Sequence, residues 1–203
     1  ERARATLRTG AACGDGYEQT PVGGHALAYD WLYDRLSAAD RRTIAAGLAA
    51  CAERIGASLR GNAPHLWHGF TSQAAALALV ALAVDEGDIP AADVARLRAD
   101  AMELFRGRAL EAYAVVGGAW PEGANYLRSH FFSADPPYQY VMDALRAWDT
   151  AVASDGPGGG SIFATIRDAE GDWLRGLALH LIYGSYPAHG PGGRITLRRA
   201  GDM

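Results

Sequence analysis

Residues 71–84 have the sequence TSQAAALALVALAV, and this stretch decides the fold class. From Ala74 to Val84 the side chains are apolar without a gap, so they point in every direction around a helix. Such a helix must be covered on all sides by other parts of the chain. The run is too short to cross a bilayer, which takes about 20 apolar residues. We therefore predict a buried central helix over residues 71–86 and no membrane span.

Amphipathic helices are predicted on both sides of this buried helix. Ser37 followed by Asp40 is typical of a helix start, and Pro90 marks a second one. Beyond each start, apolar residues recur at helical spacing on one face and leave the other face polar. These residues are Ile44, Leu48, Cys51 and Ile55 in the first helix, and Val94, Leu97, Ala101, Leu104 and Phe105 in the second.

Further helices are predicted over residues 25–36, 141–152 and 162–183. In the first of them, Tyr29, Trp31 and Tyr33 are expected to be packing residues. Amphipathic helices with one solvent-exposed face that alternate with a fully buried helix are typical of helical hairpins stacked in two layers. We predict an all-α fold over residues 1–190, arranged as an α/α toroid in the form of an incomplete ring of helical hairpins.

The C-terminal residues follow a different pattern. Residues 194–198 alternate apolar with polar side chains, as a strand does. We interpret residues 191–203 as a linker and the start of a β-rich domain, and we expect the chain to continue beyond both of its ends, since it opens on Glu1 rather than on Met.

A net charge of −4 provides no general electrostatic reason to bind nucleic acid or an anionic membrane.

Cys13 and Cys51 are the only cysteines, and they lack the paired spacing of zinc or redox motifs. Two buried free thiols are the favoured interpretation. A single disulfide is the alternative if the protein is secreted.

The first candidate site is the segment 62–70, which has the sequence NAPHLWHGF and leads into the buried helix. His65 and His68 are candidates for a base, a carboxylate partner or a metal ligand, because imidazole changes its charge near neutral pH. A zinc site is disfavoured, since a His pair at i and i+3 has no third ligand nearby. The structural alternative is that both histidines cap the helix and fill a loop.

The second candidate site is the glycine-rich segment 117–130, which brings five kinds of functional side chain together. Trp120 is suited to stack on a sugar face, Glu122 to act as acid, base or orienting group, and Tyr126 to exchange a proton. Arg128 and His130 follow within the same segment. The structural alternative is a turn with a buried tyrosine and a surface glutamate.

Together these segments resemble the helical toroid domain of the heparinase II/III-like polysaccharide lyases and the related alginate lyases. The resemblance covers most of the chain as a pattern, and its most specific part is Trp120-Pro121-Glu122-Gly123 with Tyr126 three residues on. His65-Leu66-Trp67 and the stretch 28–37, AYDWLYDRLS, carry the rest.

The resemblance implies β-elimination on a uronic-acid polysaccharide. The enzyme has to neutralise the substrate carboxylate, remove the C5 proton and protonate the departing glycosidic oxygen. By similarity, Tyr126 protonates the leaving oxygen and is also a candidate base, while His65 is the base or a carboxylate-binding group. Substrate contacts are then expected from the remaining polar and aromatic residues of both segments, namely Asn62, Trp67, His68, Trp120, Glu122, Arg128 and His130.

One position departs from the family's pattern. Pro64 stands where an asparagine often directly precedes the histidine, so the neutralising role falls to Asn62, His68 or Arg128. The family takes a further histidine from a β-rich domain after the toroid, where a structural metal is also conceivable. No cofactor and no catalytic metal are predicted. The expected partner is an acidic polysaccharide or oligosaccharide, and the resemblance alone implies a secreted or periplasmic location.

Two other functions fit the same residues. A glycoside hydrolase on a helical ring would use Glu122 as general acid and a second acid, such as Asp30 or Asp135, as general base. A non-catalytic helical scaffold or carbohydrate-binding domain would need neither segment to be reactive. The reaction product distinguishes a glycoside hydrolase from a lyase, because only elimination creates an unsaturated sugar.

Overall fold

The computed structural model describes residues 7, 21–61, 67–117, 141, 143–148, 175–176, 179, 185–189 and 195–197 of the chain. The helices are α2 (Val22–Leu32), the short 3₁₀ helix η2 (Tyr33–Arg35), α3 (Ala38–Arg60), α4 (His68–Ala83), α5 (Ala91–Ala101), the π-helical stretch η3 (Met102–Leu110) and α6 (Glu111–Val115). Residues 141 and 143–148 are also helical, and we call this part the 141–148 helix. The described helical part therefore has the all-α character predicted from the sequence.

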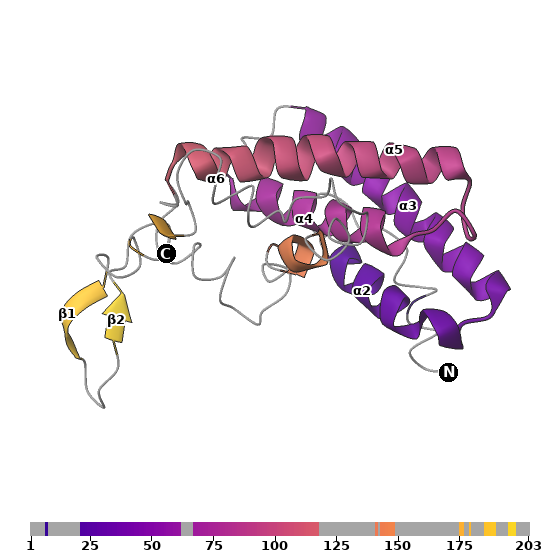
Figure 1. The fold of residues 1–203 in the computed structure, drawn as a ribbon, viewed down its shortest axis with the longest axis horizontal. Coiled ribbons are helices and arrows are strands. Elements are labelled where there is room, and N and C mark those ends of the chain that lie inside the picture. The colour runs from indigo at the N-terminus through magenta and orange to yellow at the C-terminus, as the bar shows by residue number, and fades with distance from the viewer. Residues whose placement is uncertain are drawn as a thin grey trace, which may run out of the picture.

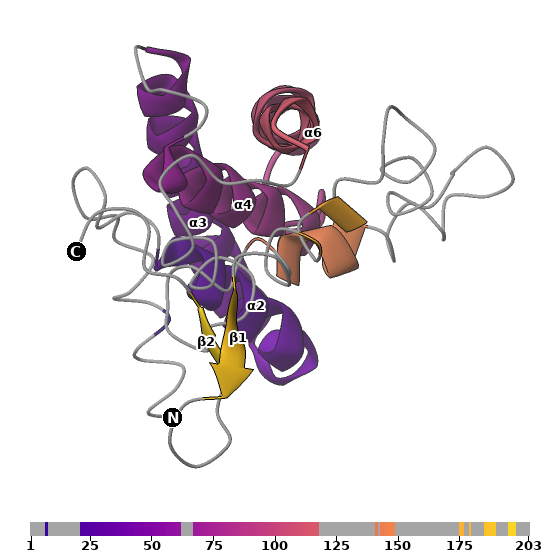
Figure 2. The ribbon, with the colours of Figure 1, turned by 90° about the vertical axis from the view of Figure 1, so that its left-hand side faces the viewer.

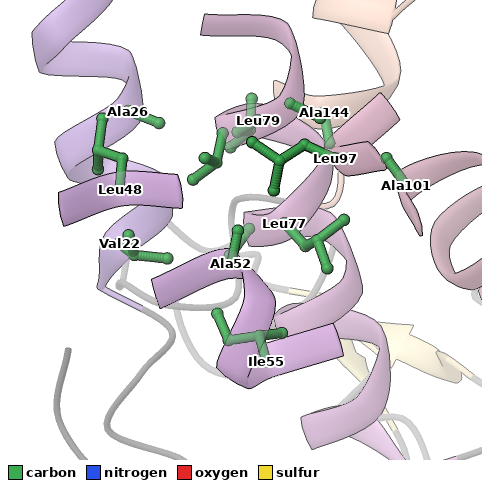
Figure 3. Close-up of a cluster of buried hydrophobic side chains, with 14 of the residues drawn as sticks. Val22, Ala26, Leu48, Ala52, Ile55, Leu77, Leu79, Leu97, Ala101 and Ala144 are labelled. Atoms are coloured by element: carbon green, nitrogen blue, oxygen red, sulfur yellow. The ribbon is translucent and has the colours of Figure 1, made fainter. Parts of the chain in front are cut away.

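Helix α4 is the centre of the molecule, as the apolar run predicts. Every residue from Gly69 to Ala81 is buried. The helix packs against α2, α3, α5 and η3, and Figure 3 shows its Leu77 and Leu79 among side chains from α2, α3 and α5 and Ala144 of the 141–148 helix. Because α4 has apolar neighbours on all sides, it has no solvent-exposed face that would need polar residues.

The two amphipathic helices begin where their sequence signals predict. Ser37 is the N-cap of α3, and its hydroxyl oxygen accepts a hydrogen bond from the Asp40 backbone N–H at 3.2 Å. Pro90 is the N-cap residue of α5. The predicted apolar faces are buried in both helices, while Arg42, Glu53 and Arg54 on the other side of α3 are exposed.

Helices α5, η3 and α6 form one unbroken helix, because the backbone stays right-handed helical at Ala101 and Glu111, where the parts join. Figure 2 looks along this helix and shows α4 between it and α2, with the 141–148 helix to one side. Helix α3 runs beside α5, since Arg96 pairs with Glu53 and Arg60 pairs with Glu103 at 3.2 Å. Both pairs join residues 43 positions apart, so α3 and the α5–η3 helix run parallel and in register.

Helices α2 and α4 form the other layer and also run parallel. Ala26 and Asp30 in the second half of α2 and Leu79 and Ala83 near the end of α4 line one cavity, so the two helices end on the same side. The 141–148 helix, which adds Ala147 to this lining, lies across α4 (Figures 1 and 2). Parallel helices within each layer and opposite directions between layers are what successive helical hairpins produce. Closure of these hairpins into a ring stays a prediction.

At the C-terminal end of the chain, strands β1 (Ser185–His189) and β2 (Ile195–Leu197) form a two-stranded antiparallel sheet. Ser185 pairs with Leu197 and His189 with Ile195, with an irregularity between these two pairs. The second strand falls on the alternating stretch 194–198. Whether a β-rich domain starts here stays a prediction.

Cys51 corrects the favoured interpretation of the cysteines. It is buried in α3, as the helical pattern predicts, but it is disulfide-bonded rather than a free thiol. The other cysteine of the sequence, Cys13, lies outside the described residues. Helical periodicity reports that a side chain is buried and carries no information on a covalent partner far away in the sequence.

Candidate functional site

Both candidate segments connect to the same end of the helical layers. Helix α4 begins at His68, directly after residues 62–67, and α6 ends at Val115, directly before residues 117–130. The loop between α4 and α5 is short, so α4 and the Ala91–Val115 helix lie antiparallel, and η3 reaches back along α4. Figure 1 shows α6 at the opposite end from this loop, on the side where α4 begins. Both segments therefore adjoin the described helices at the same end of the molecule.

The length of the second helix places the end of α6 slightly past the start of α4. At about 1.5 Å per residue, the Ala91–Val115 helix is roughly 14 Å longer than α4. Val115 is 86% exposed, in line with a helix end that projects from the core. Gly117 then has φ of 60°, a left-handed conformation that glycine adopts without strain and that ends helices.

Trp67 and His68 form the entrance of α4. Trp67 is the N-cap residue, both side chains are half-buried, and their ring centroids lie 5.6 Å apart in an edge-to-face arrangement. The indole of Trp67 lies against Gly69 so closely that a Cβ atom there would collide with its ring. Glycine at position 69 is thus required for this position of the indole. Of the residues expected to contact substrate, Trp67 and His68 are the two that the structure describes.

The electrostatics at this entrance favour an anion. Helix α4 has no acidic residue in its first turn and no side-chain hydrogen bond from its N-cap residue. The amides of a helix N-terminus carry partial positive charge, so a carboxylate is stabilised beside them. His68 is the first residue of α4, so its side chain lies at this positive end of the helix.

Three consecutive polar residues, Thr71, Ser72 and Gln73, are buried in the first turns of α4. The Thr71 hydroxyl is buried and has no hydrogen-bond partner. An unsatisfied buried hydroxyl costs stability, which sets this end of α4 apart from its alanine- and leucine-rich remainder. In the sequence these residues are a polar triplet at the start of an apolar run, and this triplet was the available signal for a distinct end of the buried helix.

A second polar cluster lies at the opposite end of α4. The buried Tyr29 hydroxyl donates a hydrogen bond to Asp88 Oδ2 at 2.7 Å, and Arg41 Nε lies 3.5 Å from Asp88 Oδ1. The Arg41 guanidinium also lies over the Tyr33 ring, 4.6 Å from its centroid. This cluster ties α2 and α3 to the loop after α4. No local pattern predicts this role of Asp88, because its hydrogen bond joins residues 59 positions apart.

Burial and the hydrogen bond to Asp88 raise the pKa of Tyr29, while the pKa of Tyr33 is raised chiefly by a hydrogen bond to Asp88. Both phenols therefore stay protonated at neutral pH. The cluster is suited to hold three chain segments together rather than to exchange protons.

Asp143 is a further titratable residue that sequence analysis did not single out. It lies near the start of the 141–148 helix, where burial raises the pKa of its carboxyl group and Arg146 lowers it. No motif marks it, because its surroundings come from helix packing.

The other predicted site residues lie outside the described residues. They are Asn62, His65, Trp120, Glu122, Tyr126, Arg128 and His130, together with Asp135 of the hydrolase alternative. Asp30, the other acid of that alternative, is exposed in the last turn of α2 and lies near the end of α4, away from the entrance that both segments adjoin. Its position does not favour shared chemistry with the second segment.

Comparison with known proteins provides no assignment, since no family model, no curated protein and no solved structure matches the chain. Among the described residues, no helix is both long and apolar enough to span a membrane. The same part of the chain contains no group of three or more His, Cys, Asp or Glu side chains arranged to hold a metal ion.

Proposed function

We propose that this protein is a polysaccharide lyase that cleaves a uronic-acid-containing polysaccharide by β-elimination. The observation that carries the proposal is that segments 62–70 and 117–130 both adjoin the described helices at the end where α4 begins. These are the segments in which the resemblance to heparinase II/III-like lyases resides. A single sugar has to contact residues from both of them.

The chemistry assigns a role to each functional side chain. Tyr126 protonates the leaving glycosidic oxygen and is also a candidate base, and His65 is the base or binds the carboxylate. Among the three candidates for neutralising the carboxylate, we favour His68, because it lies at the positive end of α4. Trp67 and Trp120 provide apolar faces on which a sugar ring can stack.

The state of Cys51 supports a location outside the cytoplasm. Disulfides persist in oxidising compartments and are rare in the cytosol of most organisms. A secreted or periplasmic enzyme would meet extracellular acidic polysaccharides directly. We propose such polymers, or oligosaccharides derived from them, as the substrates.

The test is a substrate panel with the full chain. Alginate, heparan sulfate, hyaluronan and chondroitin are each incubated with the protein, and the ultraviolet absorbance of unsaturated products is followed. A lyase produces this absorbance on at least one polymer. New reducing ends without absorbance would identify a hydrolase instead, and absence of both would contradict a catalytic function on these substrates.

Tyr126→Phe tests the mechanism on the active polymer. Loss of the phenolic proton should lower turnover by about 10²–10⁴-fold, the range typical of general acid–base catalysis. Tyr33→Phe is the matched control, since it removes a hydroxyl at the opposite end of α4 and should leave turnover unchanged. Near-normal activity of Tyr126→Phe, with unchanged helical circular dichroism, would exclude Tyr126 from the mechanism.

A further inference from the structure

A cavity of about 310 Å³ lies between α2, the end of α4 and the 141–148 helix, at the opposite end of α4 from the candidate lyase site. Among the described residues, its lining is apolar apart from one acid and consists of Ala26, Leu27, Asp30, Leu79, Leu82, Ala83 and Ala147. Ala26 and Leu79, which appear in Figure 3, are almost fully buried, whereas Asp30 is exposed. The cavity therefore has an apolar interior and a carboxylate at its solvent side.

The electrostatics of this cavity are one-sided. Neither α2 nor α4 has a basic residue in its last turn, so the negative ends of both helix dipoles are uncompensated from within these helices. Asp30 adds a full negative charge, and Asp85 and Glu86 follow α4 directly. Arg146, which precedes the lining residue Ala147, interacts with Asp143. An acid in the last turn of a helix is unfavourable unless a cation offsets it.

From these observations we propose that the cavity binds an organic cation with an apolar body, of the alkylammonium class. The alkyl part fills the space between Ala26, Leu79 and Ala83, and the ammonium group pairs with the Asp30 carboxylate. A volume of 310 Å³ is at the lower end of the range for small-molecule sites, so the ligand is small. The proposal is independent of the lyase function.

The test compares three probes of equal length on the full chain by isothermal titration calorimetry and by amide chemical shifts. These are n-octylammonium, n-octanol and n-octanoate, all below their micelle-forming concentrations. An exposed ion pair is worth about 0.7 kcal/mol, so octylammonium should bind about threefold more tightly than octanol. Octanoate should bind more weakly than either.

Variants assign the binding to this cavity. Asp30→Asn should lower the affinity for octylammonium to that for octanol, and Ala83→Phe should abolish binding of both by filling the space. Asp34→Asn, which removes an exposed acid from η2 that does not line the cavity, should change neither affinity. Equal binding of octylammonium and octanol, binding that survives Ala83→Phe, or no binding at all would overturn the proposal.

Discussion

Tyr29 and Trp31 are two positions apart on α2, yet Tyr29 is completely buried and Trp31 is 77% exposed. Both were expected to be packing residues. The expectation is confirmed for Tyr29 and wrong for Trp31, because two positions on a helix turn a side chain by about 200°. Tyr29 points toward α4 and the Asp88 loop, whereas Trp31 points away from the core. An aromatic residue on a helix therefore reports its environment only once the neighbouring elements are known.

The hydrogen bond between Tyr29 and Asp88 leads to a prediction on alkaline stability. The pKa of Tyr29 is raised above its ordinary value of 10.0 in the folded protein, so the unfolded chain loses this proton first as the pH rises. The Tyr29 contribution to the free energy of unfolding is therefore complete below about pH 10 and decreases above it. The sequence contains no lysine, so no ammonium side chain titrates in the same range.

Tyr29→Phe tests this linkage. The variant should lose about 1–3 kcal/mol at neutral pH, because Asp88 keeps a buried oxygen with one partner fewer. Its stability should then decline less steeply than that of the wild type between about pH 10 and 11. Urea unfolding at several pH values measures both effects. Parallel pH profiles for the two proteins would show that Tyr29 does not titrate differently on unfolding.

At the scale of the element, α3 depends on a local signal that its sequence contains. Ser37 accepts the Asp40 amide hydrogen bond and donates its hydroxyl proton to Asp40 Oδ2 at 2.6 Å, while Asp40 itself is buried. This arrangement satisfies one of the free amides in the first turn and places an acid near the positive end of the helix.

Ser37→Ala should therefore lower the free energy of unfolding by about 1 kcal/mol, as loss of an N-cap usually does. Ser58→Ala is the matched control, since Ser58 is an exposed position near the end of the same helix. Alanine is a better helix former than serine there, so the control should be neutral or slightly stabilising. The comparison uses urea denaturation curves, and an equal loss in both variants would contradict the capping role.

At the scale of the whole molecule, the disulfide of Cys51 connects α3 to a distant part of the chain. A disulfide stabilises a fold chiefly by restricting the unfolded chain, and removal of a native one typically costs about 2–5 kcal/mol. Cys51 is buried within the central core cluster. Reduction of the disulfide would therefore leave a free thiol packed among apolar side chains.

When the protein is denatured without reductant, we expect no thiol to react with iodoacetamide. Reduction with dithiothreitol should lower the thermal midpoint in proportion to the lost free energy. Mass spectrometry counts the alkylated cysteines, and calorimetry with and without reductant measures the midpoint. Alkylation of Cys51 in the unreduced protein would contradict the disulfide and remove its support for an oxidising compartment.

Much of the helical framework could be predicted from the sequence because its signals are local. Apolar periodicity placed the buried faces of α3 and α5, the gapless run from Ala74 to Val84 identified the central helix, and Ser37 and Pro90 marked helix starts. Each of these depends on residues within a few turns of one another. The candidate segments were found in the same way, as clusters of functional side chains close together in the sequence.

The amino-acid sequence by itself determined which segments are helical and which of their faces are apolar, since burial of a periodic pattern needs no knowledge of the partner. Only the tertiary structure decided the 43-residue register between α3 and the α5–η3 helix, the Tyr29–Asp88 contact across 59 positions and the exposure of Trp31. It also placed both candidate segments beside the end of the helical layers where α4 begins, and formed the open cavity beside Asp30 at the other end. These features arise where separate helices meet, and the energy of such a contact depends on side chains that no local pattern connects.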